Sequence, residues 1–209
     1  MQVVWTNYAY DSFLVISNGN SHMGAGVIPL TVHDKEVLFL FQKTFTGRKV
    51  GTLIDFGGGL GHGEDYRDTA VREFVEETET MYFEDDLQRA QRSIDRIQAQ
   101  VQTVNRLFEQ TLTRFPHWWR PRLSIDPAKP KDWRTYFIQF PYRDVNALNI
   151  EWASDNSGRF KKRRELVWVS ATRLLDLYAH QPEGLWKRVR QLEDASNLVR
   201  EIHSTLVNG

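Results

Sequence analysis

The first third of the chain alternates short apolar runs with polar turns, and each apolar run has the length of a strand. The predicted strands are Phe13–Ile16, Gly26–Val32, Val37–Phe41 and Gly51–Phe56. A turn over His33, Asp34 and Lys35 joins the second to the third. The last strand leads into a loop with five glycines among the seven residues from 57 to 63.

From residue 65 onward the apolar positions follow a helical period instead. Asp65 is a suitable N-cap for a helix that carries apolar side chains at Ala70, Val71, Phe74 and Val75. A second helix is predicted from Leu87 to Thr111, where apolar residues step alternately by three and four on an otherwise polar surface. The residues of this stripe are Leu87, Ala90, Ile94, Ile97, Val101, Val104 and Phe108.

The second half adds two strands and two helices. The strands are predicted over Trp133–Phe140 and Glu165–Val169, and the helices over Ala171–Ala179 and Leu185–Val207. The segments 115–130 and 142–162 are predicted to be loops. Strands on both sides of a central helix indicate an α/β sandwich, and 209 residues suit one domain.

Composition narrows the function classes. Basic and acidic residues balance at 27 each, which does not favour a nucleic-acid binder, and the absence of cysteine excludes disulfides and thiolate chemistry. No apolar run approaches the roughly 20 residues that span a bilayer. The N-terminus has neither a basic start nor a long apolar core, so we expect no signal peptide, no membrane partner and a cytoplasmic location.

The chemistry is concentrated between Gly58 and Glu77. The spacing is Gly58, five residues, Glu64, seven residues, Arg72-Glu73-Phe74, one residue, Glu76-Glu77. Glu73, Glu76 and Glu77 stand at positions i, i+3 and i+4, which places their carboxylates on one helix face. A hard divalent cation relieves their repulsion, so we expect Mg²⁺, with Mn²⁺ as a substitute.

This segment resembles the Nudix box, and every position of that pattern up to Glu77 matches. The resemblance implies an α/β/α sandwich around a mixed sheet. It also implies that Glu73, Glu76, Glu77 and the carbonyl of Gly57 bind the metal, that one glutamate acts as general base, and that Arg72 orients the glutamates through a salt bridge. Glu64 takes a secondary structural or metal-linked role.

Two positions depart from the box. Glu79 stands where the family has a glycine, and Thr80 replaces an apolar residue. Because that glycine normally ends the helix in a left-handed conformation, we expect a rebuilt helix exit here. The segment 84–121 then forms a long helical insertion within a single domain of residues 1–209.

Residues outside the box carry weaker predictions. The basic run Lys161-Lys162-Arg163-Arg164 either binds substrate phosphates or is an ordinary solvated loop. Glu165 is a further candidate for the general base, with a plain surface glutamate as the alternative. The pair Trp118-Trp119 either stacks on a nucleobase or anchors the end of the inserted helix on the core.

The predicted function is Mg²⁺-dependent hydrolysis of the phosphoanhydride bond in a nucleoside diphosphate linked to another moiety. An RNA-cap or diphosphoinositol hydrolase is the first alternative, and a non-catalytic nucleotide sensor of the same fold is the second. The expected partner is a nucleotide-type small molecule, with capped RNA as the one nucleic-acid exception. The apolar stripe packs either on its own domain or in a homodimer, and we expect the homodimer.

Overall fold

The computed structural model describes residues 23–90, 93–123, 132–160 and 163–208. Six strands form one sheet in the order β4-β5-β1-β2-β6, and β3 pairs with β1 beside this path. The strands are β1 (Gly24–His33), β2 (Glu36–Thr44), β3 (Phe56–Gly59), β4 (Trp119–Pro121), β5 (Trp133–Gln139) and β6 (Arg164–Ser170). The β1–β5 pair is parallel and the other pairs are antiparallel, so the sheet is mixed.

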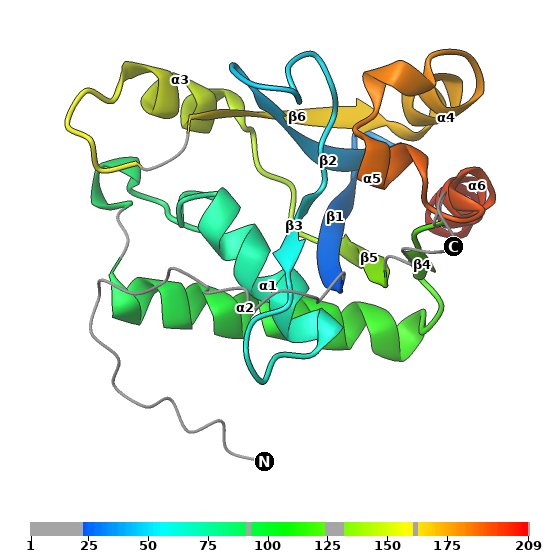
Figure 1. Ribbon diagram of the computed structural model, residues 1–209, viewed down its shortest axis with the longest axis horizontal. Coiled ribbons are helices and arrows are strands. Elements are labelled where there is room, and N and C mark those ends of the chain that lie inside the picture. The colour runs from blue at the N-terminus through cyan, green and yellow to red at the C-terminus, as the bar shows by residue number, and fades with distance from the viewer. Residues whose placement is uncertain (1–22, 91–92, 124–131, 161–162, 209) are drawn as a thin grey trace.

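Helices lie on both faces of the sheet (Figure 1). They are α1 (Tyr66–Glu77), α2 (Ile94–Arg114), α3 (Asn146–Ser154), α4 (Ala171–His180), α5 (Lys187–Arg190) and α6 (Ala195–Asn208), with short 3₁₀ turns at Leu87–Arg89 and Pro182–Gly184. Side chains alternate across the strands, so neighbouring residues enter two different cores. Val27 packs with α1, α2 and α3, whereas Ile28 packs with α4, α5 and α6. The predicted α/β/α sandwich around a mixed sheet is therefore confirmed.

The strand β3 is inserted between β1 and β2. The first half of β1 pairs with β3, through Gly24 to Val27, and its second half pairs with β2, from Leu30 onward. Farther along β2, Gln42 forms an isolated bridge with Ile54, just ahead of β3. The two long strands thus diverge around β3, and the glycine-rich segment lies at the point of divergence.

Several predicted elements are observed where the pattern placed them. The turn after β1 has positive φ at Asp34 and Lys35, as a tight two-residue hairpin requires. The helix α1 has Asp65 as its N-cap, within a capping box completed by Asp68. Strands β5 and β6 and helix α4 match their predicted ranges within two residues.

Other predictions were wrong in their boundaries. The strand predicted over Gly51–Phe56 begins only at Phe56 and runs through the glycines, because these pair with β1. The predicted loop 142–162 contains α3, which buries Leu148 and Trp152 against the core. The predicted loop 115–130 contains β4, paired to β5. The helix predicted over Leu185–Val207 is divided into α5 and α6, with Asp194 in the left-handed region between them.

The helix predicted from Leu87 to Thr111 is also divided, into a 3₁₀ turn and α2. Its stripe packs inside the chain: Val104 and Phe108 are fully buried in the core shared with α1 and β5, and Ile97 and Val101 pack against that core. Only Ile94, with 49% of its surface exposed, points largely away. The stripe therefore needs no second subunit to cover it, and the homodimer stays a prediction.

Two further points complete the comparison with the sequence. The predicted strand Phe13–Ile16 lies outside the described residues. Within the described ranges, no helix combines the length and the hydropathy that crossing a bilayer requires.

Candidate functional site

The glycine strand β3 provides the floor of the site. Gly57 and Gly58 pair with Gly26 and Ala25 of β1, so β3 is held directly against the sheet. A Cβ on Gly58 would lie only 2.1 Å from Oε1 of Glu73. Because such a contact is far inside van der Waals distance, only glycine lets the Glu73 carboxylate lie on the backbone of β3.

Arg72 is the centre of the ion pairs on α1. Its Nε donates to Oε1 of Glu64 at 2.7 Å, and its Nη1 lies 2.8 Å from Oε1 of Glu73 and 3.5 Å from Oε2 of Glu76. A further N–H donates to the Gly59 carbonyl at 3.2 Å. The resemblance predicted an arginine that orients the glutamates, and this geometry has Arg72 in contact with two of the three.

Glu64 closes the loop between β3 and α1. Its carboxylate accepts hydrogen bonds from the Gly61 N–H and the Thr69 hydroxyl as well as from Arg72. Burial alone would raise the pKa of Glu64, but the hydrogen bond and charge of Arg72, with these two donors, outweigh it and lower the pKa. The same contacts raise the pKa of Arg72 against the opposing effect of its burial. Both groups are therefore held charged.

Glu77 reaches the point where β1 and β2 diverge. It is nearly buried, and its Oε2 accepts hydrogen bonds from the Gly57 N–H at 3.0 Å and from the side-chain amide of Gln42. Its Oε1 lies 3.6 Å from Nη2 of Arg164. Glu77 and Glu73 thus both meet the glycine strand, at consecutive residues of β3.

The glutamates do not converge on one point as their side chains stand. Across the described ranges, no three His, Asp or Glu side chains are grouped closely enough to hold one ion. The donor set nevertheless fits a hard cation, because carboxylates and backbone carbonyls are the oxygen ligands that Mg²⁺ prefers. Gly58 brings the Glu73 carboxylate against the backbone of β3, whereas the Gly57 carbonyl already accepts a hydrogen bond from Arg188 at 2.8 Å.

Arg188 of α5 is a residue that the sequence did not single out. Its Nη1 donates to the Gly57 carbonyl at 2.8 Å, and its Nε donates to Oδ1 of the fully buried Asp55 at 3.0 Å. Its guanidinium stands over the ring of Trp133, 4.4 Å from the centroid. A lone arginine 131 residues from Gly57 gives no sequence signal, and only the fold brings it to β3.

The basic run before β6 divides between two environments. Arg164 lies beside Glu77, whereas Arg163 is directed at exposed backbone carbonyls, with Ala153 O at 3.4 Å. Lys161 and Lys162 lie outside the described residues. Glu165 follows Arg164 on the strand and therefore has the opposite orientation, with its carboxylate 3.9 Å from Lys43. We accordingly leave Glu165 out of the proposed site.

The two tryptophans after α2 pack within the protein, as the anchoring alternative predicted. Trp118 is fully buried, stacks on Phe115 with ring centroids 3.9 Å apart, and donates to Glu201 of α6. Trp119 is half-buried in β4, where Arg134 lies over its ring. The interpretation that this pair anchors the end of the inserted helix is confirmed for Trp118.

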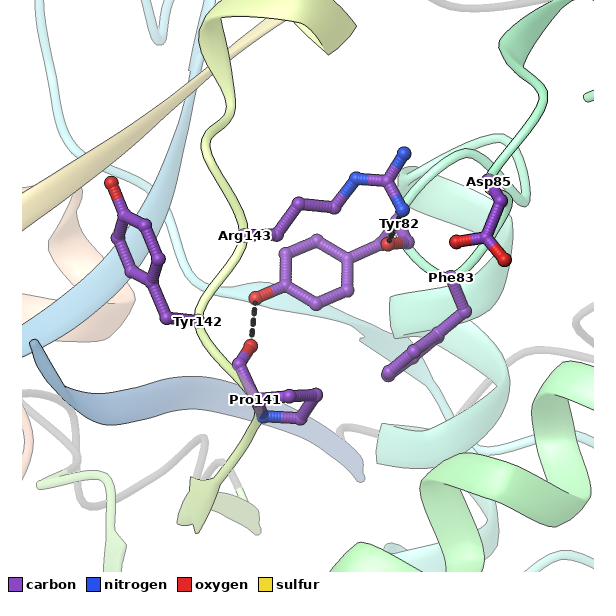
Figure 2. A pocket seen from close by; sticks show the side chains of 6 residues that line it. All are labelled: Tyr82, Phe83, Asp85, Pro141, Tyr142 and Arg143. Carbon is purple, nitrogen blue, oxygen red and sulfur yellow. Dashed lines mark hydrogen bonds between the residues drawn. The ribbon is translucent and has the colours of Figure 1, made fainter.

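A separate pocket of about 210 Å³ lies beyond the end of α1 (Figure 2). Its lining is Tyr82, Phe83, Asp85, Pro141, Tyr142 and Arg143, with no glutamate of the box. Two of its polar side chains bind the chain itself: Arg143 donates to the carbonyls of Tyr82 and Glu84, and the Tyr82 hydroxyl donates to the Pro141 carbonyl. We therefore assign this pocket a structural role.

Neither protein-family models nor curated protein sequences give a match to this chain. Among solved structures, it is similar to an Ap4A hydrolase from C. elegans in a binary complex, at 11% identity over 90% of this chain and 98% of that one, with a TM-score of 0.46. It is also similar to the Nudix hydrolase RenU from M. smegmatis, at 14% identity over 89% and 88%, with a TM-score of 0.45. For NrtR of Shewanella oneidensis the identity is 14% over 88% and 64%, and the TM-score is 0.44.

These values are too low for the likeness itself to assign a substrate or an activity. The argument comes instead from the chain's own residues, because the box from Gly58 to Glu77 forms a glycine strand, a loop and the predicted helix. That unit is carried by the mixed-sheet sandwich that the box implies. The chain therefore has a Nudix-type fold.

Proposed function

We propose that this chain is a Mg²⁺-dependent Nudix-type pyrophosphohydrolase. The observation that supports this most is the position of Glu73 and Glu77, whose carboxylates lie against consecutive glycines of β3 while Arg72 holds Glu73 and Glu76 from the other side. A structural acidic helix has no need of bare glycine backbone opposite its carboxylates. A site that brings metal and phosphate close to the main chain requires such glycine backbone.

In this proposal Glu73, Glu76, Glu77 and the Gly57 carbonyl hold the metal. When bound, the metal neutralises phosphate charge and lowers the pKa of the attacking water. A glutamate of the cluster takes the proton of that water as its oxygen bonds to phosphorus. The bond from phosphorus to the bridging oxygen then breaks, and this oxygen leaves on the second phosphate. Arg72 holds the side chains of Glu73 and Glu76 in place through its two ion pairs.

The substrate we propose is a nucleoside diphosphate linked to another moiety, with an RNA cap or a diphosphoinositol as the alternative on the same scaffold. A nucleotide sensor without turnover is the competing function. Two observations favour it. Glu77 is engaged by Gln42, Gly57 and Arg164, and would have to release some of these contacts to ligate an ion. The Gly57 carbonyl likewise accepts a hydrogen bond from the cationic Arg188.

A turnover assay separates the hydrolase from the sensor. The protein is incubated with ADP-ribose, NADH, dinucleoside polyphosphates, oxidised nucleoside triphosphates and capped RNA, with Mg²⁺ or with a chelator. We expect hydrolysis of at least one substrate with Mg²⁺, none with the chelator, and recovery when Mg²⁺ is restored. Mn²⁺ should substitute for it.

The matched variants are Glu77→Gln in the site and Glu109→Gln on the exposed face of α2. Glu77→Gln should reduce kcat by at least about 10²-fold, because a charged metal ligand is lost, whereas Glu109→Gln should retain the wild-type rate. A Glu77→Gln variant with wild-type turnover would refute the site. Binding of a nucleotide without any Mg²⁺-dependent turnover would establish the sensor instead.

A further inference from the structure

Three cationic side chains surround the inner end of the glutamate cluster. Arg164 of β6 lies beside Glu77, Arg188 of α5 is paired with Asp55, and Lys49 in the loop after β2 is partly buried near both arginines. We call Lys49, Arg164 and Arg188 the cationic cluster. Its three positive charges face two carboxylates, Asp55 and Glu77, so it carries an excess of positive charge inside the protein.

The donors of Arg188 are used by the chain itself. They are taken by the side chain of Asp55 and by the carbonyl of Gly57. Arg188 therefore supplies positive charge and holds β3, and the donors available to a ligand must come from the other two members.

Arg164 and Lys49 each have donor capacity in reserve. The Nε of Arg164 is buried and finds no hydrogen-bond acceptor among the described residues. The Nζ of Lys49 lies 5.5 Å from the centroid of the Trp186 ring, and no carboxylate of the described residues comes within 4 Å of it. A buried donor without an acceptor costs free energy, and a ligand that supplies oxygen atoms recovers it.

The electrostatics of Lys49 agree with this geometry. Burial lowers the pKa of Lys49, and the positive charge of Arg188 lowers it further. An anion bound between these groups would screen that repulsion and favour the charged ammonium. Ligation of Glu77 to a metal would also weaken its ion pair with Arg164, which increases the need for an anion there.

We propose that the cationic cluster is a phosphate-binding subsite, in which Lys49 and Arg164 hold a phosphate group of the substrate next to the glutamate cluster. This inference rests on the proposed hydrolase function and extends it to a second substrate-binding element. Guanidinium and ammonium donors match the several oxygens of a phosphate, and the negative charge of that phosphate offsets the excess positive charge of the cluster. The subsite thus favours an anionic ligand that carries a phosphate group.

The test measures binding rather than turnover. The probe is methylene diphosphonate, a pyrophosphate analogue with no hydrolysable bridge, titrated calorimetrically at a fixed excess of Mg²⁺. Lys49→Gln should raise the Kd of the probe by at least about tenfold, as expected for loss of a charge-assisted hydrogen bond. Lys49→Arg should restore most of the affinity. The control is Arg48→Gln, an exposed cation one residue away in the same loop, which should change Kd by less than about twofold.

Three results would overturn the subsite. They are an unchanged Kd in Lys49→Gln, an equal loss in Arg48→Gln, which would indicate net charge alone, and no binding of the probe to the wild-type protein. The subsite and the proposed function fail separately. If the protein binds the probe through Lys49 but hydrolyses no substrate of the panel, the subsite stands and the hydrolase function fails. If it hydrolyses a substrate with Mg²⁺ but Lys49→Gln leaves the Kd of the probe unchanged, the hydrolase function stands and the subsite fails.

Discussion

At the scale of single residues, Arg72 and Glu64 connect the glycine loop to α1 through hydrogen bonds and an ion pair. Glu64 receives donors from Gly61, Thr69 and Arg72, so one carboxylate ties the loop to two turns of the helix. The lowered pKa of Glu64 means that the folded chain binds its proton less tightly than the unfolded chain does. This linkage makes stability depend on pH in a direction that can be stated in advance.

Replacing Glu64 by Gln should destabilise the protein in a pH-dependent way. A depressed folded-state pKa contributes stability that is present above the unfolded value, here 4.5, and is lost as the pH falls through the folded value. The difference in unfolding free energy between wild type and Glu64→Gln should therefore be largest near neutral pH and shrink below pH 4.5. Urea unfolding across that range measures it. The exposed Glu109→Gln provides the control, and a Glu64 difference that stays constant with pH would contradict the assignment.

The sequence identified the residues of the site that lie within one motif. The spacing of Arg72, Glu73, Glu76 and Glu77 fixes their common helix and much of their mutual contact. It could not identify Gln42 or Arg188, because their contacts with Glu77 and Gly57 depend on strand insertion and on the return of the C-terminal helices. The candidate Glu165 follows Arg164 on β6, so strand alternation turns its side chain toward Lys43 and away from Glu77.

At the scale of elements, the exit of α1 differs from the expectation. The helix exit is not rebuilt: Glu79 has φ of 51°, the left-handed conformation that glycine would take. The N–H of Thr80 donates to the Val75 carbonyl and the N–H of Glu79 to that of Glu76, which is the bond pattern of a Schellman cap. Thr80 also has a positive φ, of 63°. The tertiary contacts of these two buried residues thus override a conformational cost of about 1–3 kcal/mol each.

The elements that the sequence missed share a physical cause. The helix α3 buries Leu148 and Trp152 but also exposes the apolar Ile150, so its apolar residues give no clear helical period. The strand β4 is three residues long and exists because β5 offers it an edge. The long predicted helices were divided where the chain turns to pack, which a heptad pattern does not record.

The apolar stripe on α2 gives a prediction at this scale. Phe108→Ala should lower the free energy of unfolding by about 3–5 kcal/mol, because its fully buried ring packs edge-on against Tyr136. Ile94→Ala, at the exposed end of the same stripe, should cost less than about 1 kcal/mol. Chemical denaturation measures both. Equal costs, together with a wild-type stability that rises with protein concentration, would instead indicate that the stripe is a subunit interface.

At the scale of the whole molecule, the C-terminal helices are connected to the site through one buried ion pair. Arg188 of α5 reaches β3 through Asp55, which is fully buried, and through the Gly57 carbonyl. Backbone hydrogen bonds from Leu53 to Gly184 and from Trp186 to Leu53 run alongside. The last quarter of the chain therefore supports the strand on which the glutamates of α1 lie.

A double-mutant cycle tests this connection. Arg188→Met leaves the carboxylate of Asp55 buried without its cation, which should destabilise the fold by about 3–5 kcal/mol. Asp55→Asn combined with Arg188→Met removes the buried charge as well, so the double variant should be more stable than Arg188→Met alone. Arg190→Met, at an exposed arginine of the same helix, should remain within about 0.5 kcal/mol of wild type. If urea unfolding gives additive losses for the two substitutions, the pair is not coupled, and the C-terminal helices are held by their apolar packing on the sheet alone.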